Sequence, residues 1–261
     1  MGSFFTNLHV RCERTADPVA KIKSLGLGPT YISDIENGWL SIFPLKTEEQ
    51  NPDEIIKVCA RVSQIFCSPA LAFLVHDSDI FMYFLARGGE LVDFYNSDCG
   101  YFDENESHEP EGGNPELILP LCQPGTKETV LRRLLHEHLY GAKNDSRDEL
   151  ITADDIAFAL SELLGIPDWR VPLGFDYIED GEAQECPLTE IVTAADILPI
   201  IPNKEGFVQC PGCSYHFSVR NTDSFDGKKH KSCGQRLAIA ALVQASTSLN
   251  ADLAPHLLTS A

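Results

Sequence analysis

Four residues near the C-terminus have the types and spacing of a metal site. Cys210 and Cys213 form a C-x-x-C pair, and His230 and Cys233 form an H-x-x-C pair further along the chain. Structural zinc takes four thiolate or imidazole ligands in a tetrahedron, so two chelating pairs joined by a short polar segment predict a structural Zn²⁺ site. Four protein ligands leave no open position for a catalytic water.

His216 is the alternative fourth ligand, because it follows Cys213 by three residues. His230 is favoured because it closes a second chelate ring with Cys233. A histidine in the set argues for zinc over a rubredoxin-like iron site, which takes four thiolates. The remaining alternative is a ribbon that has lost its metal.

This segment resembles a bacterial zinc-ribbon family whose pattern reads CPxC, FxV, GK and CxxCG. The family has cysteine at the third ligand, where this chain has His230. The likeness covers about 30 residues and implies a metal-stabilised ribbon without implying an activity. The remainder, through TNLHVR, VHDSD and ELVDFYNS, resembles uncharacterised bacterial proteins. The matching ribbon positions are Val208, Cys210, Pro211, Cys213, Phe217, Val219, Gly227, Lys228, Cys233 and Gly234.

A second group of chemically capable residues follows two predicted strands. His76, Asp77 and Asp79 lie at the end of one strand, and Asp93 lies in a later one. Imidazole and carboxylates together bind divalent cations or act as acid and base, so a metal-dependent hydrolase is the alternative function. The competing interpretation is that Asp-Ser-Asp is ordinary turn chemistry.

The formal charge of −19 is unevenly distributed. Residues 203–236 contain six basic and three acidic side chains, a balance of +3, so the rest of the chain carries −19 − 3 = −22. An acidic body of this kind repels nucleic acid and anionic membranes. The second alternative function, nucleic-acid binding, therefore belongs to the basic ribbon, through Arg220, Lys228, Lys229 and Lys231.

The composition also predicts a compartment. No apolar run is long enough to span a bilayer, and the first residues lack a secretory signal pattern. Nine cysteines, an odd number and mostly without paired spacing, are typical of a reducing environment. These features predict a cytoplasmic protein.

Residues 1–125 are predicted to form an α+β domain that positions these side chains. Its pattern indicates an antiparallel sheet with helices on one face, in an arrangement that could be ferredoxin-like. Residues 98–116 hold seven acidic and no basic side chains and are predicted to be a surface loop. The predicted strands are 4–10, 30–35, 39–45, 70–76, 80–86 and 90–96, and the predicted helices are 18–25 and 52–66.

Residues 126–202 are predicted to be a helical extension and linker packed on that domain. Thr126 and Thr152 are expected to cap two amphipathic helices. Residues 173–178 are predicted as a strand and 189–198 as a short helix. Residues 203–249 are expected to contain the ribbon and a terminal helix, 236–249.

The metal site is the strongest signal, and no catalytic set matches it. The sequence therefore favours a non-enzymatic interaction or regulatory protein with a structural Cys3His zinc ribbon. Its partner is expected to be another protein.

Overall fold

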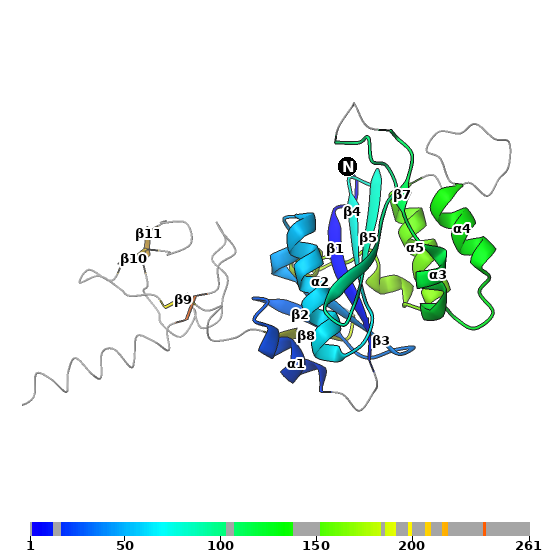
Figure 1. Ribbon diagram of the computed structural model, residues 1–261. Helices are drawn as coiled ribbons and strands as arrows, with labels where there is room; N and C mark the ends of the chain where they lie inside the picture. Colours follow the sequence, from blue (N-terminus) through cyan, green and yellow to red (C-terminus); the bar gives the residue numbers. More distant parts are fainter. Residues whose placement is uncertain are drawn as a thin grey trace, which may run out of the picture. The chain divides into compact units, whose positions relative to one another are not determined.

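The computed structural model describes residues 2–12, 17–102, 107–137, 152–183 and 186–191, together with four short strands nearer the C-terminus. The chain divides into two compact units, Met1–Ile191 and Val192–Ala261 (Figure 1). Among the described residues, no helix combines the length and the apolar character needed to cross a membrane.

The first unit is built on an eight-stranded antiparallel sheet, so the predicted α+β class is confirmed. The strand order is β7-β6-β5-β4-β1-β3-β2-β8, with β1 and β4 near the centre (Figure 1). The strands are β1 (Phe5–Arg11), β2 (Thr30–Ser33), β3 (Trp39–Pro44), β4 (Ala70–His76), β5 (Ile80–Arg87), β6 (Glu90–Asn96), β7 (Glu111–Gly112) and β8 (Leu188–Ile191).

Tight turns set the register of this sheet. Asn37 and Gly38 join β2 to β3 with φ of 52° and 77°, and Asp77 and Ser78 join β4 to β5 with φ of 53° and 59°. Two consecutive residues with positive φ match the twist of antiparallel strands, which is why Asn, Asp and Gly occupy these positions. The predicted strands 30–35 and 39–45 are therefore joined as a hairpin, and so are the predicted strands 70–76 and 80–86.

Two helices, α1 (Pro18–Leu25) and α2 (Pro52–Phe66), cover one face of the sheet. The Asn51 side chain caps α2 by accepting from the backbone N–H groups of Asp53 and Glu54. The apolar residues of α2 are buried against the sheet because they recur every three or four positions. The buried stripe comprises Ile55, Val58, Cys59, Val62 and Phe66.

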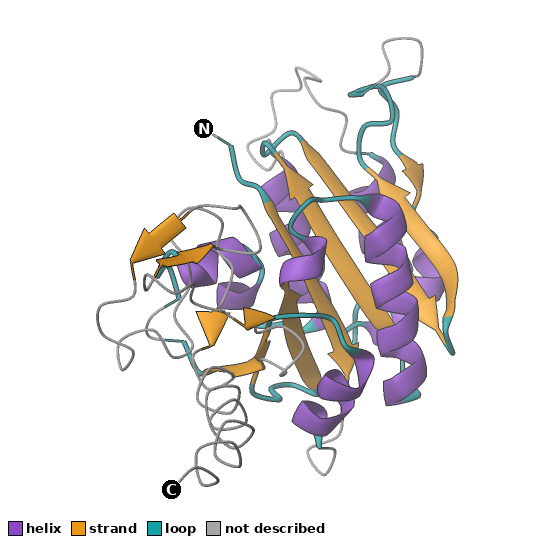
Figure 2. Cartoon of the chain, turned by 90° about the vertical axis from the view of Figure 1, so that its left-hand side faces the viewer, coloured by secondary structure: helices purple, strands orange, loops and turns teal. Residues whose placement is uncertain are grey.

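The other face is covered by α3 (Pro115–Ile118), α4 (Glu128–His136) and α5 (Ala153–Leu164). Figure 2 shows helices on both sides of the strands. The prediction of helices on one face is thus incomplete: the helical extension packs on the second face, where strand residues such as Phe5, Phe73 and Phe81 need cover. The acidic segment predicted as a loop contributes β7 and the start of α3.

Three local predictions are wrong. Residues 173–178 are not a strand, because Phe175–Glu179 forms helix α6, in which Phe175 is buried and Ile178 packs against the apolar cluster of Phe43 and Leu173. The predicted helix 189–198 instead begins with β8, which pairs with the edge of β2. Helix α4 starts after Lys127 without a side-chain cap, so Thr126 does not cap it.

The second unit contains two short strand pairs among its described residues. Strands β10 (Phe207–Gln209) and β11 (His216–Ser218) form an antiparallel hairpin, with Val208 opposite Phe217. Strand β12 (Leu237–Ala238) pairs in parallel with β9 (Leu198–Pro199), so the predicted helix 236–249 does not include Leu237 and Ala238. The rest of that predicted helix lies outside the described residues.

Candidate functional site

The predicted zinc ligands lie outside the described residues. Cys210 and Cys213 belong to the segment that joins β10 to β11, and His230 and Cys233 follow β11 in the sequence. The alternative ligand, His216, is the first residue of β11, and its backbone is opposite Gln209.

The structure brings His76, Asp77 and Asp79 together at the β4–β5 turn, where their contacts hold the turn and the N-terminal segment. Asp79 N–H donates to the His76 carbonyl at 3.0 Å, and the Gly2 N–H donates to the Asp77 carboxylate at 3.1 Å. His76 Nδ1 lies 2.7 Å from Gln50 Oε1. These groups have protein partners of the kind expected in a structured turn.

Aromatic rings surround the His76 imidazole. The rings of Phe4 and Phe102 lie edge-on to it, with centroids at 4.7 Å and 5.3 Å, and Tyr101 lies at 6.0 Å. The Tyr101 hydroxyl also donates to the Asp79 carboxylate at 3.4 Å.

Asp93 is separated from this turn. His76 is opposite Ile80 at one end of β5, whereas Asp93 is opposite Leu85 near the other end. At ~3.4 Å per residue, five positions correspond to about 17 Å along the sheet. Asp93 accepts from the Tyr83 hydroxyl at 2.7 Å and from Asn114 N–H at 3.0 Å. Burial raises the pKa of this carboxyl.

No group of three or more His, Cys, Asp or Glu side chains within the described part of the chain is placed to hold a metal ion. Cys59 is completely buried, and burial raises its thiol pKa to about 12, so it packs as a small apolar side chain.

A buried polar network on β1 was not predicted from the sequence. His9 is completely buried, and its Nδ1 lies 2.8 Å from Ser41 Oγ on the neighbouring strand. Arg170, also fully buried, donates to the Trp39 carbonyl and to the Glu36 carboxylate, each at 3.1 Å. Burial and then the charge of Arg170 lower the pKa of His9 to about 3, so this imidazole is neutral at physiological pH.

Asn7 fixes the chain that follows Arg170. Its side-chain amide donates to the carbonyls of Val171 and Leu173 at 2.8 Å and 2.9 Å. A side chain on the central strand thus supplies hydrogen bonds to an irregular segment that packs on the sheet. This satisfies backbone groups that would otherwise be buried without partners.

Glu48 holds the start of α6. Its carboxylate accepts from Phe175 N–H at 2.6 Å, and Gly174 approaches so closely that an added Cβ would lie 3.0 Å from Oε1. Burial raises the Glu48 pKa to about 7, and the nearby Asp176 charge acts in the same direction.

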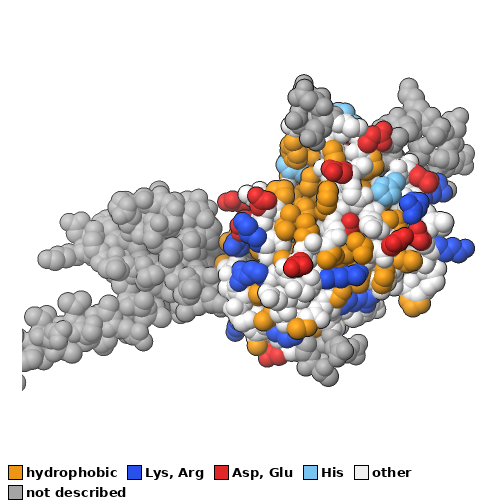
Figure 3. Space-filling model, in the orientation of Figure 1, with side chains coloured by type: hydrophobic (Ala, Val, Ile, Leu, Met, Phe, Trp, Pro, Cys, Tyr) orange, Lys and Arg blue, Asp and Glu red, His pale blue; other side chains and the backbone are white. Residues whose placement is uncertain are grey.

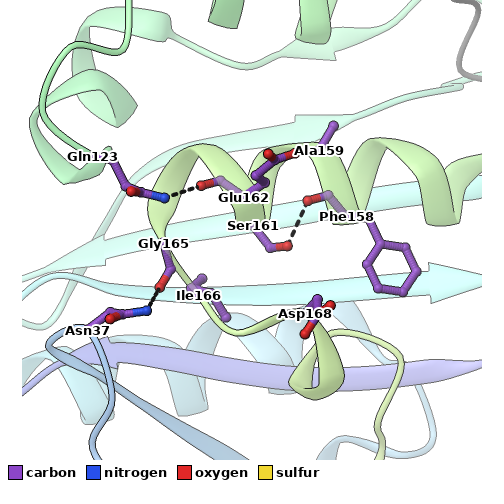
Figure 4. Close-up of a pocket in the computed structure, with 9 residues that line it drawn as sticks. All are labelled: Asn37, Gln123, Phe158, Ala159, Ser161, Glu162, Gly165, Ile166 and Asp168. Carbon is purple, nitrogen blue, oxygen red and sulfur yellow. Dashed lines mark hydrogen bonds between the residues drawn. The ribbon is translucent and has the colours of Figure 1, made fainter.

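A cleft of about 520 Å³ opens at the C-terminal end of α5 (Figure 4). Asn37 donates from its side chain to the Gly165 carbonyl at 3.1 Å, and Gln123 donates to the Glu162 carbonyl at 2.7 Å. These bonds tie the end of α5 to the turn before β3 and to the segment that follows α3. The cleft is lined by Asn37, Gln123, Phe158, Ala159, Ser161, Glu162, Gly165, Ile166 and Asp168.

Strand β6 exposes three large apolar side chains. Leu91, Val92 and Phe94 are each 37–39% exposed. The register of the pairing between β5 and β6 shifts between Leu85 and Ala86 of β5. Figure 3 shows hydrophobic side chains gathered on one face of the first unit. Exposed apolar patches on a protein surface are typical of interaction sites.

The cleft and the buried network could not be recognised from local patterns, because their residues come from distant parts of the chain. The Asn37 side chain bonds to Gly165, and the charge of Arg170 acts on His9. The only signal was the polar pair Asn7 and His9 at alternating positions of β1, which places both on one face.

Comparisons with known proteins found no matching family model, no matching curated protein and no matching solved structure.

Proposed function

We propose that the protein is a non-enzymatic interaction protein of the cytoplasm, in which a C-terminal zinc ribbon is held by Cys210, Cys213, His230 and Cys233. The observation that carries the proposal is the β10–β11 hairpin, because the segment between its strands contains the C-x-x-C pair. A hairpin that brings a chelating pair into its connection is the local structure that a zinc ribbon requires.

The metal in this proposal is structural. Four protein ligands complete a tetrahedral zinc site, and the binding free energy contributes to the folding of the module. The side chains would act as thiolates and one neutral imidazole, and a substrate has no role at the ion.

The interaction role is supported by the first unit. Its described residues contain no metal-binding group, and the hydrolase candidates divide between the β4–β5 turn and the position of Asp93. The exposed Leu91, Val92 and Phe94 of β6 offer an apolar contact surface instead.

We also propose that the core of the first unit is ferredoxin-like. The element order β1-α1-β2-β3-α2-β4 and the strand order β4-β1-β3-β2 support this arrangement. Both helices contribute to the same apolar cluster, as the split βαβ topology requires.

Ligand substitutions test the ribbon. Cys210→Ser, Cys233→Ser and His230→Ala should each lose the bound zinc, whereas His216→Ala should keep it. Cys67→Ser, an exposed cysteine of the first unit, is the matched control and should keep the metal. Loss of zinc in His216→Ala with retention in His230→Ala would contradict the ligand assignment.

To test the interaction role, a binding partner is first identified, and the complex is then reconstituted from purified components. Phe94→Glu should weaken that binding, since a charge cannot be buried at an apolar contact without cost. Removal of zinc with a chelator is the second change, and it should also weaken the binding of the partner. A partner that binds equally well after both changes would contradict the proposal.

A further inference from the structure

We propose that the cleft at the C-terminal end of α5 binds a cationic N–H donor group on an apolar stem, such as a guanidinium or a primary ammonium. This inference concerns the first unit and does not depend on the zinc ribbon. A volume of about 520 Å³ lies within the range of small-ligand sites.

The polar side chains that line the cleft carry hydrogen-bond acceptors. One amide N–H of Asn37 and one of Gln123 donate to the carbonyls of Gly165 and Glu162, so each side chain keeps its oxygen and a second N–H for a ligand. The Ser161 hydroxyl donates to the Phe158 carbonyl at 2.7 Å. The two amide oxygens and the Ser161 hydroxyl oxygen can therefore accept from a donor group on a ligand.

The charges of the lining select a cation. Glu162 and Asp168 contribute two carboxylates, and the nine lining residues include no lysine or arginine. The C-terminal end of α5 adds the negative pole of the helix dipole. The nearby Arg11 guanidinium is engaged elsewhere, because it donates to the Asn37 and Leu121 carbonyls and lies over the Trp39 ring.

An aromatic side chain completes the site. Phe158 is 36% exposed and lines the same cleft as the two carboxylates (Figure 4). A ring face attracts a cation and also packs against a methylene stem. The ligand class is therefore a guanidinium or ammonium with an aliphatic chain, either a free amine or an Arg or Lys side chain of a partner.

Two pairs of probes test the proposal with the full chain. N-acetyl-arginine amide should bind and shift the backbone NMR signals of residues 158–168, whereas its neutral isostere N-acetyl-citrulline amide should not. Agmatine tests the free-amine source. Both cations should bind; tighter binding of the arginine amide indicates a side chain of a partner, and tighter binding of agmatine indicates a free cation.

Matched substitutions separate this site from general attraction to an acidic surface. Glu162→Gln and Asp168→Asn should each weaken binding about tenfold, the loss expected for one charge-assisted hydrogen bond. Glu90→Gln removes an exposed carboxylate on β6 and should leave the affinity unchanged. Equal binding of arginine and citrulline amides, equal weakening by Glu90→Gln, or no binding would overturn the proposal.

Discussion

His9 and Glu48 make opposite contributions to the pH dependence of folding. The pKa of His9 falls to about 3 in the folded chain, against 6.5 for the free side chain. Between these values the unfolded chain binds a proton that the folded chain does not, so acidification destabilises the fold. The pKa of Glu48 rises to about 7 from 4.5, so in the window 4.5–7 the folded chain holds the extra proton and acidification stabilises it.

The two effects should nearly cancel between pH 6.5 and pH 5. One proton difference is worth about 1.4 kcal/mol per pH unit, and partial titration reduces the total over this interval to about 1.5 kcal/mol for each group. Glu48→Gln removes the stabilising contribution but keeps an acceptor for Phe175 N–H. Relative to wild type, this variant should lose about 1.5 kcal/mol more stability on acidification.

His9→Gln should show the opposite change. Relative to wild type, it should gain about 1.5 kcal/mol between pH 6.5 and pH 5, because the buried imidazole that resists protonation is gone. Urea unfolding at the two pH values, followed by tryptophan fluorescence, measures both differences. The two tryptophans, Trp39 and Trp169, belong to the first unit and report on it alone.

The comparison of each variant with wild type removes the contributions of all other titrating groups. Variants whose pH dependence matches wild type, or shifts in the same direction for both substitutions, would refute the reasoning about these two environments.

Two further pairs of substitutions have expected effects on the unfolding free energy, measured by the same assay at pH 7. Thr152→Ala should cost about 1 kcal/mol, because this side chain caps α5 in a capping box, whereas Thr126→Ala should change it by less than about 0.5 kcal/mol. Gly113→Ala should cost about 1–3 kcal/mol, because φ is +76° and the new Cβ would lie 2.8 Å from the Tyr95 ring. Gly125→Ala, with φ of +95° and open space around it, should cost about 1 kcal/mol from backbone strain alone. Equal costs within either pair would contradict the local geometry.

Local chemistry made much of the first unit predictable. The Asn51 cap, Pro52 and the apolar stripe through Val62 specify α2, and the Asn37-Gly38 turn specifies the β2–β3 hairpin. Each of these signals acts within a few residues, so the sequence carries it directly.

The wrong secondary-structure predictions concern segments whose structure depends on long-range packing. Residues 173–178 alternate like a strand, yet Phe175–Glu179 forms α6, where Phe175 lies against the Tyr31 ring and Ile178 packs against the cluster of Phe43 and Leu173. Residues of β8 join the sheet because β2 offers an edge. These outcomes depend on contacts across more than a hundred residues.

The same distinction applies to the candidate sites. Spacing alone defines the Cys210 and Cys213 pair, because both ligands lie in one short segment. The α5 cleft joins Asn37, Gln123 and Asp168, whose sequence positions give no sign that they meet. The sequence places His76 at the end of one strand and Asp93 in a later strand, which gave the prediction that they lie together. Their partners on β5, Ile80 and Leu85, show that the two residues are separated along the sheet.

The zinc content of the full chain, purified without added zinc, tests the central claim most directly. Elemental analysis should find about one zinc per chain, the stoichiometry of a single tetrahedral site. Cys233→Ser should abolish it, and a chelator should perturb the NMR signals of β10 and β11 while those of the first unit remain. Less than about 0.3 zinc per chain, with β10 and β11 unaffected by chelation, would contradict the account.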